Sequence, residues 1–339
     1  MRGYSTSFSL ASSALPGRIR AHIEAVYAMV RVADELVDGA WEGADPAAVR
    51  EELDRFESVI ACAVASGFST DLIAHAFART ARHTGIGPAQ WEPFFASMRS
   101  DIPAAPEAVS PEVTGLTSDT PTSEAAPEAA VLTPEQLAAY IHGSAEVVGE
   151  MCVLAFFDGD PLPPDADERL LPGARALGSA FQKVNFIRDI AHDSSRLRRG
   201  YLVAPGHAHA GFTEAERDRL TDEVFAELAL AAPAIDLLPR SVRPAVWTAF
   251  GVFAELTHRI ARTPAHRVAR TRIRVPDPVK AGLAARAAAG RPRTSWPGLE
   301  RAKDNSARQT QAQDTPTTQT HVRAATHVRA ATHTRARQA

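Results

Sequence analysis

The sequence predicts an all-α protein that folds as one large helical domain. Two segments, residues 26–38 and 177–193, combine apolar residues at helical spacing with a stripe of polar side chains. Apolar positions recur every three or four residues through most of the chain as far as residue 289. The length of 339 residues and the hydrophobic content of 45% are sufficient for such a domain, which we place at residues 1–290.

Helices are predicted where this periodicity is bounded by capping residues, prolines or glycines. Pro16 and Gly17 precede the first helix. Thr133 is a suitable N-cap for a later one, because Glu135 and Gln136 follow it in the first turn. The turn at residues 158–164 leads to the central helix. The predicted helices cover residues 18–38, 46–66, 70–83, 88–99, 133–157, 177–193, 213–230, 242–262 and 278–289.

Two segments break the helical pattern. Residues 103–130 hold five prolines, five acidic residues and no basic residue, which predicts a disordered insertion. Residues 291–339 form a basic, low-complexity tail in which THVRAA occurs twice, at 320–325 and 326–331, and we expect it to be disordered. The tail could contact an anionic membrane surface or simply be solvated, and its composition favours the second interpretation.

Composition narrows the class of protein. The formal charge is −3, and the tail alone carries nine basic and three acidic residues, so the body is acidic and a nucleic-acid partner is not expected. No apolar run approaches the ~20 residues of a membrane-spanning helix, and no signal peptide is evident, so we expect a cytoplasmic protein that is at most peripheral to a membrane. Cys62 and Cys152 lie in separate apolar segments, where buried free thiols are expected. No oligomeric state follows from the sequence.

The central helix carries the first candidate site. Asn185, Asp189 and Asp193 are four residues apart, so they drift by only about 40° per step around a helix and form one stripe. Gln182 and Arg188 flank this stripe, and the remaining faces are apolar. A single acidic stripe of this kind is usually a solvated surface, but it also suits oxygen ligands that point into a cavity.

A second acidic pair favours the interpretation as oxygen ligands over that of a solvated surface. Asp34 and Asp38 repeat the four-residue spacing on another apolar helix. Like charges at this spacing repel by about 0.2–0.5 kcal/mol on an exposed helix, whereas a divalent cation would reverse the sign. Mg²⁺ is commonly held by one or two carboxylates together with phosphate oxygens of a substrate. The two clusters therefore predict a diphosphate-binding site between helices.

These segments carry a family resemblance. QKVNFIRDIAHD at 182–193 and YAMVRVADELVD at 27–38 resemble the two aspartate-rich motifs of the phytoene, squalene and dehydrosqualene synthases, the head-to-head trans-prenyl transferases. Three other segments are similar to motifs of this family, in the family's order: YSTSFSLASSALP at 4–16, AYIHGSAEVVGEM at 139–151 and RRGYL at 198–202. The four tyrosines of the chain all fall inside the matched segments.

The resemblance implies a fold and a reaction. The fold is an isoprenoid synthase-type helical bundle with a central cavity, and the enzyme uses Mg²⁺, with Mn²⁺ as the alternative. Two prenyl diphosphates condense head to head through a cyclopropyl diphosphate. The wording of the N-terminal and first aspartate motifs favours two geranylgeranyl diphosphates and phytoene, in carotenoid biosynthesis, over squalene or dehydrosqualene from farnesyl diphosphate. Only squalene formation uses NADPH, so no such requirement is expected.

The resemblance also assigns roles to residues. The residues implied to bind metal are Asp34, Asp38, Asn185, Asp189 and Asp193. The residues implied to bind diphosphate are Ser5, Ser7, Arg31, Arg188 and Arg199. The residues implied to take part in catalysis are Tyr27, Arg31, Tyr140, Gln182, Arg188 and Tyr201.

Some residues depart from the family pattern. Glu146 stands where the family usually has a small residue, and Phe250 and Phe253 stand where a tyrosine is often found. A carboxylate beside an apolar prenyl channel would be costly unless it were paired or turned away. Two alternatives stay open. The departure at Glu146 favours a single-substrate class I terpene cyclase. A non-catalytic prenyl-lipid-binding or assembly factor would be expected to lack metal ligands, whereas all five are present.

Overall fold

The computed structural model describes residues 11–38, 41, 43–102, 132–196 and 212–313. Of residues 38, 191–196 and 306–313 it describes the backbone alone. Met1–Lys303 form one compact unit and Asp304–Ala339 a second. The predicted insertion at 103–130 and the repeats at 320–331 lie outside the described residues.

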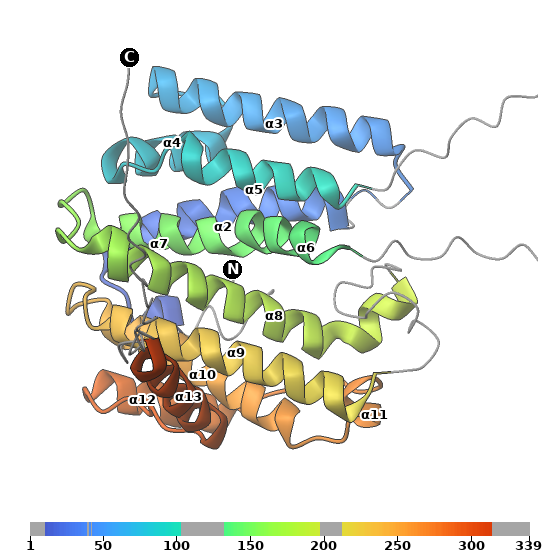
Figure 1. Ribbon diagram of the computed structural model, residues 1–339. Helices are drawn as coiled ribbons and strands as arrows, with labels where there is room; N and C mark the ends of the chain where they lie inside the picture. The colour runs from blue at the N-terminus through green and yellow to red at the C-terminus, as the bar shows by residue number, and fades with distance from the viewer. Residues whose placement is uncertain (1–10, 39–40, 42, 103–131, 197–211, 314–339) are drawn as a thin grey trace, which may run out of the picture. The chain divides into compact units, whose positions relative to one another are not determined.

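All regular structure in the described part is helical, which confirms the all-α prediction (Figure 1). Two π-helical turns are present, His142–Glu146 between α6 and α7 and Ala166–Leu170 before α8. The helices are α2 (Gly17–Asp38), α3 (Pro46–Ser66), α4 (Leu72–Thr84), α5 (Pro88–Ser100), α6 (Pro134–Ile141), α7 (Val147–Phe157), α8 (Leu171–Arg196), α9 (Glu214–Ile235), α10 (Arg243–Ala261), α11 (Ala265–Val268), α12 (Asp277–Ala288) and α13 (Pro297–Gln313).

Local chemistry explains where these helices begin and end. Asp45 caps α3 by accepting a hydrogen bond from the backbone N–H of Ala47, and Gly67 ends that helix in the left-handed conformation. The hydroxyl of Thr133 accepts a hydrogen bond from the backbone N–H of Gln136. In turn, Oε1 of Gln136 accepts from the backbone N–H of Thr133, so the predicted N-cap is confirmed. The helix boundaries are therefore largely readable from the sequence.

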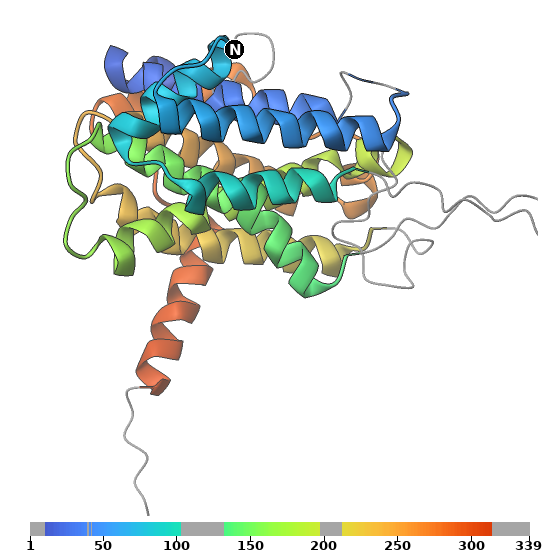
Figure 2. The same cartoon turned by 90° about the horizontal axis from the view of Figure 1, so that it is seen from above.

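In the first unit, α8 lies between two groups of helices (Figure 1). α2, α3, α4 and α5 pack on one another on one side, as Figure 2 shows from above, and their buried apolar residues form one core with α7. α9, α10 and α12 lie on the other side and share a second core with α8. Side chains of α8 can therefore face both groups.

Two glycines bring α8 into backbone contact with α7 and with the π-helical turn that precedes it. A Cβ added to Gly178 would lie 2.4 Å from the carbonyl oxygen of Ala145, and one added to Gly149 would lie 2.6 Å from that of Ala174. Real Cβ atoms do not approach so closely, so larger residues at 149 or 178 would push the two helices apart.

The chain stays packed beyond the point where we predicted that order ends. Trp296 and Leu299 are fully buried, and Trp296 Nε1 donates a hydrogen bond to Glu255 of α10 at 3.1 Å. The guanidinium of Arg293 lies 4.5 Å from the centre of the Trp296 ring. The prediction of disorder from residue 291 onward is therefore wrong for these positions. Two isolated apolar residues in a polar stretch give no periodic signal, so the sequence did not predict their burial.

Candidate active site

Two adjoining cavities lie in the first unit. One has a volume of about 420 Å³ and polar walls, and the other has a volume of about 320 Å³ and apolar walls. Ser144 and Gln182 line both cavities. A ligand with a polar head and an apolar chain could therefore occupy the two together.

The polar cavity gathers most of the predicted site residues whose side chains are described. α2 contributes Tyr27, Arg31 and Asp34, which repeat at four and three residues and so share one face of the helix. α8 contributes three residues spaced three apart, which also share one helix face, and α6 contributes one aromatic residue. These residues are Gln182, Asn185, Arg188 and Tyr140. Positions far apart in sequence thus meet around one space, although their catalytic and metal-binding roles stay predictions.

The charged groups of the polar cavity are paired within each of its two main helices, and Arg272 adds a third cation. Arg31 bonds to both Asp34 and Glu35 within α2. On α8, Asp189 accepts from Nε of the adjacent Arg188 at 3.0 Å and from Nε of Arg272 at 3.0 Å. The side chains of Arg31, Arg188 and Arg272 are 34%, 23% and 47% exposed, so each guanidinium can also reach a bound anion.

Tyr140 is held by a buried acid. Its hydroxyl donates to Oδ2 of Asp101, which follows α5, at 2.8 Å. Both residues are buried, and the Tyr140 ring lies 6.1 Å from that of Phe186 on α8. In the sequence, Asp101 matches an aspartate of the resembled family but could equally be an ordinary helix terminus. The hydrogen bond to Tyr140 links it to the cavity wall.

The oxygen-bearing residues of this cavity fit a hard divalent cation. The carboxylate of Asp34 and the amide of Asn185 line the same space from α2 and α8, and Asp189 lies one turn beyond Asn185. Mg²⁺ prefers such ligands and completes its shell with water or phosphate oxygens. Arg31 and Arg188 already contact the two carboxylates, so they would have to share or release them on ion binding.

Several predicted residues cannot be placed. Asp38 and Asp193 belong to α2 and α8, but their side chains are outside the described residues. Ser5, Ser7, Arg199 and Tyr201 lie in segments outside the described part of the chain. Their assignments stay predictions.

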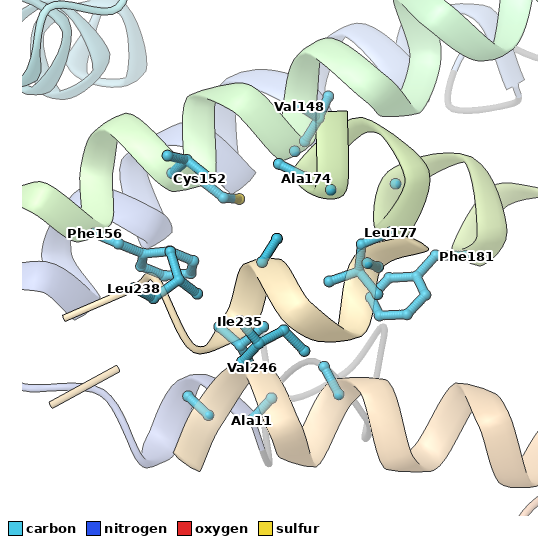
Figure 3. Close-up of a pocket in the computed structure, with 18 of the residues that line it drawn as sticks. Ala11, Val148, Cys152, Phe156, Ala174, Leu177, Phe181, Ile235, Leu238 and Val246 are labelled. Carbon is cyan, nitrogen blue, oxygen red and sulfur yellow. The ribbon is translucent and has the colours of Figure 1, made fainter. Parts of the chain in front are cut away.

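The apolar cavity is walled by small and aliphatic residues of α7, α8, α9 and α10 (Figure 3). Cys152 points its sulfur into this space, and burial raises the pKa of its thiol to about 12. The side chain therefore stays neutral and adds to the apolar lining. Cys62 is exposed instead of buried as we expected, and neither cysteine is in a disulfide.

Aromatic rings stand where the two cavities approach each other. Phe181 of α8 lines the apolar cavity and Phe253 of α10 lines the polar one. The two rings stack with centroids 3.8 Å apart and an angle of 16° between their planes. Phe250, by contrast, is fully buried in the core beside Trp247 and Trp296. Of the two phenylalanines noted in the sequence, Phe253 is the one at the site.

Glu146 is turned away from both cavities. Its neighbours Ser144, Ala145 and Val148 line them, but Glu146 pairs with Nδ1 of His142 at 3.0 Å within the π-helical turn. The cost expected for a carboxylate beside an apolar channel is therefore avoided. Glu146 therefore no longer supports the alternative of a single-substrate terpene cyclase.

Sequence reasoning missed two residues of the site. Arg272, in the segment after α11, lines the polar cavity and binds Asp189. Its only signal is the basic pattern TRIRV at 271–275, which has no helical periodicity. The Ser144 hydroxyl is buried without a hydrogen-bond partner among the described residues, at the junction of the cavities. No pattern distinguished it from an ordinary helical serine.

Comparison with known proteins agrees with this geometry. The profile of the squalene/phytoene synthase family matches residues 1–278. A bifunctional lycopene cyclase/phytoene synthase of Pyrenophora tritici-repentis is 26% identical over 290 residues, which are 80% of this chain and 47% of that protein. One of Colletotrichum graminicola is 31% identical over 211 residues, 62% of this chain and 34% of that protein. The chain thus spans about half or less of these relatives' length.

Solved structures share the fold. A dehydrosqualene synthase in complex with a ligand superposes with a TM-score of 0.64 at 19% identity, over 85% of this chain and 93% of that one. The squalene synthase HpnC of Alicyclobacillus acidocaldarius gives 0.59 at 19% identity, over 77% and 90%. Among the helices that the structure describes, none is long and apolar enough to cross a membrane.

Proposed function

Because the chain belongs to the squalene/phytoene synthase family, we propose that it condenses two prenyl diphosphates head to head, with two geranylgeranyl diphosphates giving phytoene. The observation that carries this proposal is the pair of cavities joined at Ser144 and Gln182. A diphosphate suits the charged cavity and a prenyl chain suits the apolar one. The curated relatives named above support the choice of phytoene.

The acidic residues have a role in binding the leaving group. Asp34, Asn185 and Asp189, together with Asp38 and Asp193, would hold Mg²⁺, with Mn²⁺ as the alternative. Such an ion neutralises charge on a departing diphosphate. Arg31, Arg188 and Arg272 surround the same space and can donate to diphosphate oxygens as they do to carboxylates.

The apolar walls protect the reacting carbons. Ionisation of an allylic diphosphate leaves a carbocation that water would quench. The apolar cavity must therefore exclude water while the diphosphate departs into the polar cavity. The lining by Cys152, Leu177 and Phe181 supplies no nucleophile, because the thiol is neutral. The stacked Phe181 and Phe253 rings lie where π faces can stabilise a cation. Released diphosphate can accept the final proton, so no strong base is required.

The direct experiment uses purified protein with Mg²⁺ and either the C15 or the C20 prenyl diphosphate, with and without NADPH. Extracted hydrocarbons are identified by mass spectrometry. We expect a C40 hydrocarbon from the C20 substrate without NADPH. A C30 product alone would reassign the chain to squalene or dehydrosqualene synthesis, and the NADPH dependence would separate those two.

A substrate-sized hydrocarbon, or no product, would contradict the proposal that two substrate molecules are condensed. The matched variant is Asp189→Asn, which keeps the shape of the side chain but removes its charge, and we expect at least a 100-fold loss of turnover with the helical circular-dichroism signal retained. Asp222→Asn, on the exposed face of α9, is the control.

The cytoplasmic location, with at most peripheral membrane contact, also stays a proposal, and cell fractionation would test it.

A further inference from the structure

A group of two histidines and one aspartate lies outside both cavities. His22 is on α2, His83 is in the last turn of α4, and Asp158 directly follows α7. Their ligand atoms all lie within 4.8 Å of one another. His22 precedes Asp34 by twelve residues on the same helix, which places the group roughly 18 Å along the axis from the aspartate motif.

The two imidazoles converge on one carboxylate oxygen of Asp158. Nε2 of His22 lies 3.0 Å and Nε2 of His83 lies 2.9 Å from Oδ1 of Asp158. Four ligands around Zn²⁺ at about 2.0–2.1 Å stand about 3.3 Å apart, so small movements would bring these three atoms onto one ion. The observed separations are ordinary hydrogen-bond lengths, and they are close to the spacing of zinc ligands.

One of the two tautomers of His22 favours a cation at this point. Nδ1 of His22 lies 3.0 Å from the Thr80 hydroxyl, which is buried. If Nδ1 donates this bond, neutral His22 points the lone pair of Nε2 at a carboxylate oxygen, and two acceptors face each other. A metal ion between them removes the conflict, and Thr80 then fixes the tautomer as an outer partner of a ligand.

The surrounding backbone also favours a cation at this point. The site stands at the carboxyl ends of α4 and α7, where the helix dipoles favour positive charge. Asp158 has φ of 53°, the single positive value of a non-glycine residue in the described part of the chain. A Cβ at the next residue, Gly159, would lie 2.9 Å from the carbonyl oxygen of His83. The turn is therefore pressed against α4 in a conformation that directs Asp158 toward the histidines.

We propose that His22, His83 and Asp158 form a binding site for a borderline transition metal ion such as Zn²⁺, separate from the Mg²⁺ site of the active centre. Two imidazoles and a carboxylate are a ligand set for zinc, with a fourth position left for water, whereas Mg²⁺ prefers oxygen ligands. The ion would tie α2, α4 and the end of α7 together.

Arg18 is the competing cation. Its Nε lies 3.2 Å from Oδ2 of Asp158 and its Nη2 lies 3.0 Å from Nε2 of His83. The Arg18 side chain is 69% exposed, whereas those of His22, His83 and Asp158 are 14%, 39% and 24% exposed. Arg18 can therefore swing into solvent when an ion enters. The ion and the guanidinium would occupy the site alternately.

The test titrates the full-length protein with Co²⁺, the spectroscopically visible substitute for Zn²⁺, in excess Mg²⁺ that fills the oxygen sites. We expect one equivalent to give the visible absorption bands of tetrahedral cobalt, and Zn²⁺ to displace it. His22→Ala, His83→Ala and Asp158→Ala should each weaken binding by more than about 100-fold, and Thr80→Val by about 10–100-fold. Arg18→Gln should bind more tightly.

His75→Ala is the matched control, because His75 is on α4 but outside the group. The tail histidines are present in every variant, so their contribution cancels. Zn²⁺ should raise the melting temperature of the wild type and of His75→Ala but not of His83→Ala. Equal binding by the wild type and all three ligand variants, or no bound ion in the wild type, would overturn the proposal. So would weaker binding by Arg18→Gln.

Discussion

The hydroxyl of Tyr140 donates a hydrogen bond to the carboxylate of Asp101 across 2.8 Å, and both residues are buried. This bond joins α6 to the end of α5 at the wall of the polar cavity. Buried polar groups depend on such partners, because a lost hydrogen bond is not replaced by water.

Tyr140→Phe should therefore destabilise the protein while preserving the ring. We expect the free energy of unfolding to fall by about 1–3 kcal/mol, since the carboxylate loses a donor inside the protein. Asp101→Asn keeps an acceptor for the hydroxyl and should cost less. Urea unfolding of both variants measures the difference, and a Tyr140→Phe protein as stable as the wild type would contradict the assigned role.

Arg272→Ala should impair the reaction with little effect on folding. The residue lines the polar cavity and binds Asp189, so its loss removes one charge-assisted contact to the diphosphate. We expect kcat/KM to fall about 10–100-fold. Arg270→Ala, two residues earlier and exposed, is the control. Equal kinetics of the two variants would remove Arg272 from the site.

Cys152→Trp should shorten the chain that the apolar cavity accepts. The cavity volume is about 320 Å³ and the cysteine sulfur points into it, so an indole would occupy much of the space (Figure 3). Activity with the C20 substrate should fall more than activity with the C15 substrate. Cys62→Trp, at an exposed position on α3, should change neither. Equal losses for both substrates would argue that the chain lies elsewhere.

Two glycines should respond to alanine in opposite directions. Gly178→Ala places a Cβ 2.4 Å from the carbonyl oxygen of Ala145 and should destabilise the protein by about 1–3 kcal/mol. Gly282 lies inside α12 with open space around it, so Gly282→Ala should stabilise by up to about 1 kcal/mol. Thermal unfolding of the pair checks this, and a stabilised Gly178→Ala would refute the close packing of α8 on the π-helical turn His142–Glu146.

Glu227 should make stability fall as pH rises. Burial raises the pKa of its carboxyl group, although the hydrogen bond and charge of Lys183 oppose the shift, and Oε2 is buried without a hydrogen-bond partner in the described structure. The folded protein then binds more protons than the unfolded chain above the ordinary glutamate pKa of about 4.3. The free energy of unfolding should thus decrease through this window up to the raised pKa.

Glu227→Gln removes that contribution. The stability of the wild type minus that of the variant, from urea unfolding at several pH values, should decline from roughly pH 4 upward. A difference that rises with pH in the same window would show that the Lys183 pair dominates instead.

Helical periodicity and capping residues were enough to predict most of the helices in this protein. The observed α3, α5 and α10 agree with the predicted ranges to within a residue, because apolar spacing, prolines and caps are local signals. The helix predicted at 213–230 continues to Ile235 through Pro233, and the one at 133–157 contains a π-helical turn. Neither feature has a local signature strong enough to predict.

From spacing alone, the sequence predicts that Tyr27, Arg31 and Asp34 share one helix face. It also predicts a stripe of Asn185, Asp189 and Asp193 on another helix, flanked by Gln182 and Arg188. What those faces enclose depends on the packing of the whole bundle. Arg272 reaches Asp189, Tyr140 reaches Asp101, and Glu146 turns toward His142, because packing between distant segments fixes these contacts. The convergence of His22, His83 and Asp158 has the same origin, since α2, the end of α4 and the end of α7 must meet before their side chains can share an ion.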